Sequence, residues 1–278
     1  MRQEIKDLYK KSYELRANVV KMVYNAGTGH AAPSLSMAEI LTALYFHIMR
    51  LNTEEPHWKD RDRFILSKGH ACPIYYAALA KKGFFPEEDL RQYRALNSKL
   101  QGHPDMRKCP GVDMTTGSLG NGAAASLGMA LIGKKDKKDY YIYAVCGDGE
   151  LQEGIVWESA MYAGNAHLDH LIWFVDYNGL QSGGRVEDIQ SLDNLEEKFR
   201  SFGWDVQTID GHDIEAIIQA AEKAQNTKGA PSVILAKTVK GKGVSYMEGQ
   251  YLWHMKAPDD EQYVIAMEEL EKEEKQYE

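Results

Sequence analysis

Apolar positions recur along this chain with two different periods. Helical spacing predicts an amphipathic helix over 6–26 that ends at Gly27, and further helices at 37–48, 74–82, 121–132, 151–165 and 213–225. Short apolar runs of the kind that form buried strands occupy 63–66, 140–146, 171–176, 204–209 and 232–239. Residues 83–115 look irregular, and a charged, helix-like segment covers 268–278. This alternation predicts an α/β fold with a mostly parallel sheet covered by helices on both faces.

Length and composition narrow the class of protein. The 278 residues are 44% apolar, with no internal repeat or composition break, so we expect a single domain over 1–278. A net charge of −8 argues against nucleic acid or a membrane surface as a partner. Three widely spaced cysteines (Cys72, Cys109 and Cys146) indicate neither a disulfide scaffold nor a zinc site. The charged N-terminus and the absence of long apolar runs predict a cytoplasmic protein.

Oxygen-bearing side chains follow two of the predicted strands. The run 140–146 stops at Gly147-Asp148-Gly149, and the run 171–175 is followed within three residues by Asn178. In open α/β sheets, ligands bind at the carboxyl ends of strands, and carboxylate and amide oxygens suit Mg²⁺ that a diphosphate also holds. Alternatively, Asp148 caps the following helix and Asn178 belongs to a turn with Gly179.

The spacing of these residues resembles the thiamine diphosphate motif in its transketolase version. There are 28 residues between Gly149 and Asn178, and the segment between them carries Glu153, Glu158 and an Ala-Gly pair at 163–164. Further segments resemble transketolase motifs in the same order: GH at 29–30, SKGH at 67–70, GHP at 102–104, TTGSLGNG at 115–122, and KGKGV at 240–244 followed by His254. The resemblance to the transketolase family therefore covers nearly the whole chain.

The resemblance implies a set of cofactor and metal contacts. Mg²⁺ would be held by Asp148, Asn178 and the backbone carbonyl of Leu180, with Ca²⁺ or Mn²⁺ as substitutes. Thiamine diphosphate would contact His70, Gly117, Leu119, Gly147, Asp148, Gly149, Glu153 and Asn178. Glu153, with Glu158 as its companion, would also lie at a subunit interface. A solvated carboxylate at a helix start is the alternative for Glu153.

Three histidines are implied as catalytic residues: His30, His103 and His254. Imidazoles can donate to sugar hydroxyls and move protons near neutral pH. Five histidines match no motif and are interpreted as structural or surface residues: His47, His57, His167, His170 and His212. Lys242 is interpreted as a solvated lysine. Two sites depart from the family pattern beside catalytic histidines: Ala31-Ala32 stands where Pro-Gly is common, and Met255 where glycine is usual.

The implied activity is transfer of a two-carbon ketol group from a ketose phosphate to an aldose phosphate, as in the pentose phosphate pathway. The cofactor supplies the carbanion chemistry and the protein orients it. The pyrimidine-binding and C-terminal domains of the family, with the glutamate that activates the cofactor, are expected on a separate partner chain, in a heterotetramer with two copies of each. Two alternatives remain: the α subunit of a 2-oxo-acid dehydrogenase, and a non-catalytic regulatory subunit.

Overall fold

A five-stranded, fully parallel sheet forms the centre of the protein. In the computed structural model, which describes residues 1–277, the strand order is β1-β2-β3-β5-β4. The strands are β1 (Arg63–Leu66), β2 (Ile142–Gly147), β3 (Leu171–Tyr177), β4 (Asp205–Asp210) and β5 (Ser232–Lys237). Every neighbouring pair is parallel, which confirms the predicted α/β class.

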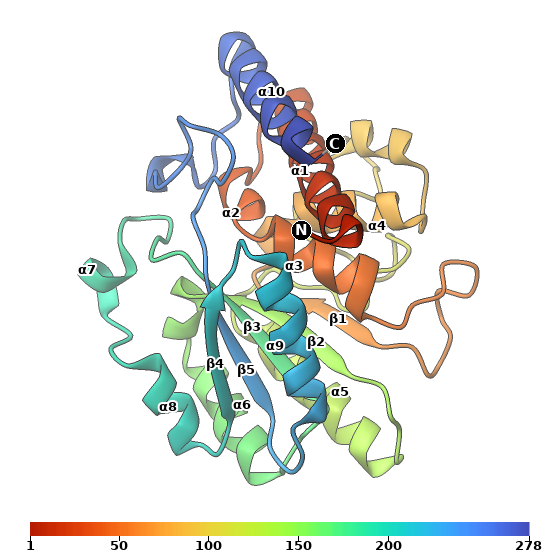
Figure 1. The fold of residues 1–278 in the computed structure, drawn as a ribbon, viewed down its shortest axis with the longest axis vertical. Coiled ribbons are helices and arrows are strands. Elements are labelled where there is room, and N and C mark those ends of the chain that lie inside the picture. The colour runs from red at the N-terminus through yellow and green to blue at the C-terminus, as the bar shows by residue number, and fades with distance from the viewer. Residues whose placement is uncertain (278) are drawn as a thin grey trace.

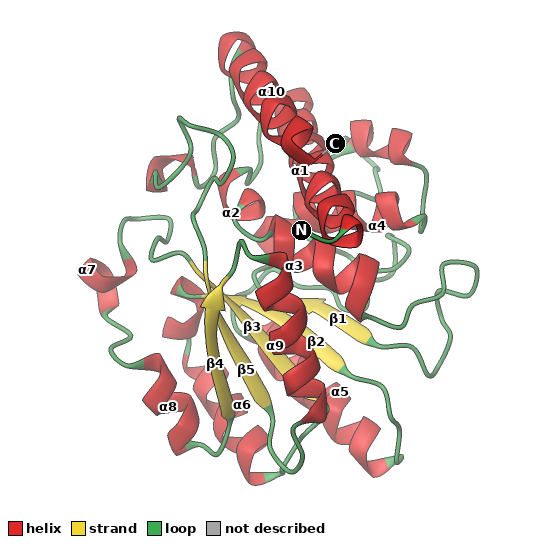
Figure 2. Cartoon of the chain, viewed as in Figure 1, coloured by secondary structure: helices red, strands yellow, loops and turns green. Residues whose placement is uncertain are grey.

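Helices connect the strands and extend the chain at both ends (Figures 1 and 2). The α-helices are α1 (Gln3–Ala26), α2 (Ala32–Leu35), α3 (Ala38–Ala43), α4 (Cys72–Lys82), α5 (Asn121–Lys135), α6 (Gly154–Asn165), α7 (Val186–Gln190), α8 (Leu195–Ser201), α9 (Ile214–Asn226) and α10 (Asp260–Glu274). Short helices of other types are η1 (Leu44–Ile48), η2 (Gly69–Ala71), η3 (Glu87–Gln92), η4 (Gly149–Gln152), η5 (Tyr251–Trp253) and η6 (Lys275–Tyr277). In residues 1–277, no helix is long and apolar enough to cross a membrane.

Both faces of the sheet are covered, because alternate strand residues point to opposite sides. In β3, Leu171, Trp173 and Val175 belong to one apolar cluster, which also contains side chains of α5, α6 and α8. Ile172 and Phe174 belong to a second cluster with α1, α3, α4 and α9. Figure 1 shows α9 crossing in front of the sheet. The near-continuous burial of β2 and β3 follows from this arrangement.

The predicted strands agree with the structure to within two residues at every end, whereas the helices differ more. The segment predicted as one helix over 37–48 consists of α3 followed by the π-helical turn η1. The predicted helix over 151–165 begins instead with the 3-10 turn η4. The short helices α7 and α8 were not predicted, since five and seven residues give too few turns for a periodic pattern. The helix expected at 268–278 begins earlier, with a capping box at Asp259.

Candidate cofactor site

A pocket with a volume of about 150 Å³ opens beyond the carboxyl ends of the strands. Because all the strands are parallel, the segments that follow β1, β2, β3 and β5 meet at this edge of the sheet. Most of the predicted cofactor residues line this pocket. The complete lining consists of Pro33, Lys68, His70, Leu119, Gly147, Asp148, Gly149, Glu150, Asn178, Leu180, Gln181, Ser182, Lys240 and His254.

Asp148 is buried at the first turn after β2, with 2% of its surface exposed. Its carboxylate accepts hydrogen bonds from the backbone N–H groups of Gly149, at 2.7 Å, and of Gly179. Burial and the nearby Asp176 carboxylate nevertheless raise the pKa of Asp148 to about 6. A buried carboxylate whose charge is incompletely compensated is suited to a cation, so the residue fits the predicted metal position.

Asn178 and Leu180 follow β3 and present oxygen atoms to the same pocket. The Asn178 Oδ1 atom accepts from the backbone N–H of Leu180 at 3.0 Å, while Nδ2 donates to Asp176 at 3.1 Å. Within the described 277 residues, no three His, Cys, Asp or Glu side chains are grouped so that they could hold a metal ion. The available donors are therefore one carboxylate, one amide oxygen and a backbone carbonyl, a set that suits Mg²⁺ when a ligand supplies further oxygens.

Lys68 and Asp176 form a buried ion pair beside these oxygens, and the sequence interpretation missed both residues. The Lys68 side chain also donates to the Pro33 carbonyl at 2.8 Å. Burial alone would raise the pKa of Asp176, but Lys68 and hydrogen bonds from Ser36 and Thr238 lower it. Lys68 lies inside the SKGH motif and Asp176 lies near the end of a buried strand, and these two signals could have identified them.

Lys240, from the segment after β5, also lines the pocket. Its Nζ atom donates to the carbonyl of Leu180 at 3.2 Å and lies 2.9 Å from Nδ1 of His254. Burial and the positive charge of Lys68 lower the pKa of Lys240 to about 8, against the attraction of Asp148. An ammonium group can only donate, so His254 accepts through Nδ1 and carries its proton on Nε2.

Three histidines from distant parts of the chain gather at this end of the sheet. The ring centres of His30 and His70 are 5.1 Å apart, and that of His254 lies 5.3 Å from His30 and 5.0 Å from His70. Burial is the main cause that lowers their pKa values: to about 4 for His30, to about 3 for His254, and well below the usual range for His70. All three are therefore neutral at pH 7, and the buried Nδ1 atom of His30 has no partner within the protein.

The 115–122 loop lies against the SKGH segment and His103. A Cβ atom at Gly117 would lie 3.2 Å from the His103 ring, and one at Gly69 would lie 2.8 Å from the Gly117 backbone nitrogen. A Cβ atom at Gly122 would lie 2.5 Å from the Cα of Ser67. Glycine at these positions therefore permits the close packing that brings Leu119 into the pocket. Burial and the charge of Arg94 lower the pKa of His103.

Comparison with known proteins agrees with this geometry. The model of the transketolase thiamine diphosphate binding domain matches residues 10–275. The chain belongs to the transketolase family. It is 46% identical to a 6-deoxy-6-sulfo-D-fructose transketolase subunit of a Clostridium species, over 96% of this chain and 97% of that protein. It is 40% identical to an apulose-4-phosphate transketolase subunit of Phocaeicola vulgatus, over 96% of this chain and 95% of that protein.

Solved transketolase structures share the fold but are much longer. The transketolase of Campylobacter jejuni superposes with a TM-score of 0.91 at 33% identity, covering 100% of this chain and 46% of that one. These matches confirm the resemblance to the transketolase family, which is a family of transferases. They favour it over the alternative of a 2-oxo-acid dehydrogenase α subunit.

In this member of the transketolase family, Glu150 rather than Glu153 lines the pocket. Glu150 is buried, and its carboxylate accepts from Ser67, from Gly120 N–H at 2.7 Å and from Gly147 N–H at 3.0 Å. It thereby joins the loop after β1, the 115–122 loop and the turn after β2. Glu153 is exposed at the start of α6, outside the pocket lining, where a surface or interface role remains a prediction.

The two departures from the transketolase pattern have different surroundings. Ala31 and Ala32 are completely buried, so their side chains pack in the core. Met255 is 58% exposed and directly follows His254 in the chain.

Proposed function

We propose that this chain is the N-terminal subunit of a split transketolase that transfers a two-carbon ketol group from a ketose phosphate to an aldose phosphate. The observation that carries the proposal is the pocket at the strand ends, which combines a buried carboxylate, oxygen ligands, two lysines and the neutral histidines His70 and His254, with the His30 ring packed next to both. The relatives named as transketolase subunits support it, because this chain spans nearly their full length.

In this proposal Asp148, Asn178 and the Leu180 carbonyl hold Mg²⁺, and the metal and Lys240 together fix a diphosphate. Lys68 is compensated by Asp176, so Lys240 and the metal are the cations that favour an anionic ligand group in the pocket. When bound, thiamine diphosphate supplies the nucleophilic carbon and the electron sink for carbon–carbon cleavage. The chain contributes orientation, charge compensation and positioned imidazoles.

The histidines are proposed to bind and protonate substrate oxygens. A neutral imidazole offers one donor and one acceptor, which matches a hydroxyl or a carbonyl of a sugar. His254 presents Nε2–H because Lys240 occupies Nδ1. His30 has an unpartnered Nδ1 atom for a ligand. His103, beside Gly117, is the most exposed of the proposed catalytic histidines and is proposed to contact the sugar hydroxyls.

The rest of the site is proposed to come from a second chain that carries the pyrimidine-binding domain. That chain would supply the carboxylate that activates the cofactor and the groups that bind the sugar phosphate. The proposed assembly contains two copies of each chain, with Glu153 and the exposed surface of α6 at the contact. Met161 and Tyr162 in α6 are 55% and 52% exposed, which supports a covered surface there.

For the substrate we propose an anionic ketose. The relatives are named for a sulfonated fructose and for apulose 4-phosphate, so the anionic group differs even among close sequences. A test panel therefore contains xylulose 5-phosphate, fructose 6-phosphate, apulose 4-phosphate and 6-deoxy-6-sulfofructose as donors.

The test is reconstitution with a pyrimidine-domain chain encoded next to this one. Sedimentation of an equimolar mixture, with Mg²⁺ and thiamine diphosphate, should give a heteromer that carries ketol-transfer activity on the panel. This chain alone should be inactive, and a mixture made with Asp148→Ala should assemble without activity. Full activity of this chain alone would refute the split-enzyme proposal. An assembled but inactive wild-type mixture would favour a regulatory subunit.

A further inference from the structure

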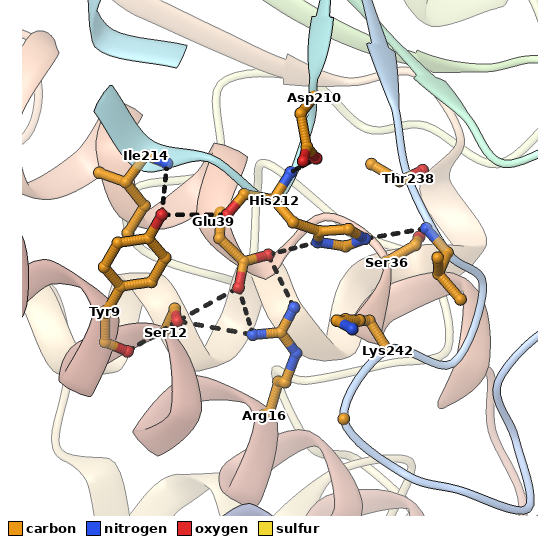
Figure 3. A network of polar contacts seen from close by, with 12 residues as sticks. Tyr9, Ser12, Arg16, Ser36, Glu39, Asp210, His212, Ile214, Thr238 and Lys242 are labelled. Atoms are coloured by element: carbon orange, nitrogen blue, oxygen red, sulfur yellow. Dashed lines mark hydrogen bonds and ion pairs between the residues drawn. The ribbon is translucent and has the colours of Figure 1, made fainter. Parts of the chain in front are cut away.

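A network of buried polar side chains lies next to the loop of residues 238–243 (Figure 3). Its centre is Glu39 in α3, 3% exposed, which forms a bidentate ion pair with Arg16 of α1 at 2.5 and 2.7 Å. Burial alone would raise the pKa of Glu39, but Arg16 and His212 lower it to about 2. Arg16 is completely buried, so the pair is isolated from solvent.

His212, in the turn between β4 and α9, connects this ion pair to the 238–243 loop. Its Nδ1 atom lies 2.9 Å from Glu39 Oε2, and its Nε2 atom lies 2.8 Å from the backbone nitrogen of Val239. A backbone N–H can only donate, so Nε2 is unprotonated and Nδ1 carries the proton that Glu39 accepts. The two contacts thus specify one neutral tautomer of His212.

The loop also approaches Arg16 of the same network closely. Gly243 has φ +90°, and a Cβ atom there would lie 3.3 Å from Cδ of Arg16. Gly211 permits a similar approach at the start of the loop, since its Cβ atom would lie 2.5 Å from the methyl group of Thr238. Lys240 lies between these two close contacts in the sequence, and its side chain points toward Leu180 and His254.

We propose that Arg16, Glu39 and His212 form a positioning unit that sets the place of the Lys240 ammonium group in the pocket. His212 is a positioning residue in this unit, because it touches the loop backbone and not the pocket. Through this unit, side chains of α1 and α3 fix the position of the loop after β5. The consequence for cofactor binding rests on the proposed function, whereas the geometry of the loop does not.

The test compares the wild-type chain with His212→Leu, which removes both contacts, and His212→Gln, which retains one donor and one acceptor. The matched control is His47→Leu, since His47 also contacts a glutamate, Glu4 at 2.9 Å, but at the surface. Two measurements need no ligand: hydrogen exchange of the Val239 amide, and the rate of amine labelling of Lys240 relative to Lys242, read by mass spectrometry.

We expect His212→Leu to speed exchange at Val239 at least tenfold and to raise the Lys240/Lys242 labelling ratio several-fold. His212→Gln should restore most of both values, and His47→Leu should change neither. An unchanged ratio in His212→Leu, or an equal change in His47→Leu, would overturn the proposal. If thiamine diphosphate does not bind at all, the proposed function fails while these two measurements still decide the positioning role.

Nitrogen-15 spectra of the imidazoles provide a second, independent test on the unaltered protein. The wild-type chain should show His212 as the neutral tautomer with the proton on Nδ1. A proton on Nε2, or on both nitrogens at pH 7.5, would contradict the contact with Val239. This measurement decides the matter even if His212→Leu fails to fold.

Discussion

Lys68 and Asp176 form an ion pair in which neither side chain is more than 3% exposed. Each comes from the end of a different strand, and Asp176 also accepts hydrogen bonds from Ser36 and Thr238. One carboxylate therefore joins the ends of β1 and β3 to α2 and to the loop after β5. Lys68 of this pair lines the pocket.

Asp176→Asn should lower the free energy of unfolding by about 3–5 kcal/mol, because it leaves the Lys68 ammonium group buried without a countercharge. Urea denaturation measures the loss. The exposed pair of Glu271 and Lys275 serves as the control, and Glu271→Gln should leave the stability nearly unchanged. Equal effects of the two substitutions would show that the buried pair contributes no more to the free energy of unfolding than the exposed pair.

Asp148→Ala should abolish Mg²⁺-dependent binding of thiamine diphosphate by the assembled enzyme, since it removes the one charged side chain among the ligands that we propose for the metal. Asn178→Ala should have a milder effect, because a neutral amide contributes less than a carboxylate. Isothermal titration calorimetry on the reconstituted complex measures both affinities. Near wild-type affinity in Asp148→Ala would refute the metal assignment.

The metal-free chain should lose stability as the pH rises from about 4 to about 6, through the titration of Asp148. The pKa of this group is raised from 3.8 to about 6 on folding, so its contribution is present below pH 4 and is lost as the folded group ionises. Asp148→Asn removes this titration and should exceed the wild type at pH 7 by up to roughly 3 kcal/mol.

Thermal or urea unfolding of both proteins at pH 4 and pH 7, without divalent metal, checks this sign. The histidines titrate with the opposite sign, because the lowered pKa values of His30 and His254 cost stability as the pH falls below 6.5. Both proteins share the contribution of the histidines, so it cancels when their free energies of unfolding are subtracted. A difference that shrinks as the pH rises would be the wrong sign for a raised pKa.

His103→Ala and His254→Ala should reduce turnover by roughly 10²–10⁴-fold while leaving cofactor affinity nearly unchanged. Both imidazoles are proposed to contact substrate oxygens, and neither is a predicted metal ligand. Steady-state kinetics of the reconstituted enzyme, paired with calorimetry, separates the two effects. Loss of cofactor affinity as severe as in Asp148→Ala would contradict the substrate role.

Two glycines of the same helix should respond in opposite directions to alanine. A Cβ atom at Gly122 would lie 2.5 Å from the backbone of Ser67, whereas one at Gly128 meets nothing within 4 Å. We expect Gly122→Ala to destabilise the protein by about 1–3 kcal/mol. Gly128→Ala should be neutral or stabilising by up to about 1 kcal/mol, because it improves helix propensity. Thermal denaturation of the two variants is the comparison.

The local sequence determined the strands and the order of the motifs. A strand that is buried on both faces must be apolar along its length, and the parallel sheet places the next polar residues at one edge. The positions of Asp148 and Asn178 beside one pocket therefore followed from the chain pattern alone. The short helices α7 and α8 did not, because five and seven residues are too few to show a periodic pattern, and α8 is positioned by packing against β4.

Only the tertiary structure decided which polar groups meet. Lys240 and Leu180 are 60 residues apart, and Glu39 and His212 are 173 residues apart, so no local pattern relates them. His212 looked like a surface or structural residue in the sequence, and its link to the 238–243 loop appears only when β4, β5 and α3 are packed together. Such contacts are selected by burial: once these groups leave water, each must find a partner of matching charge or hydrogen-bonding type.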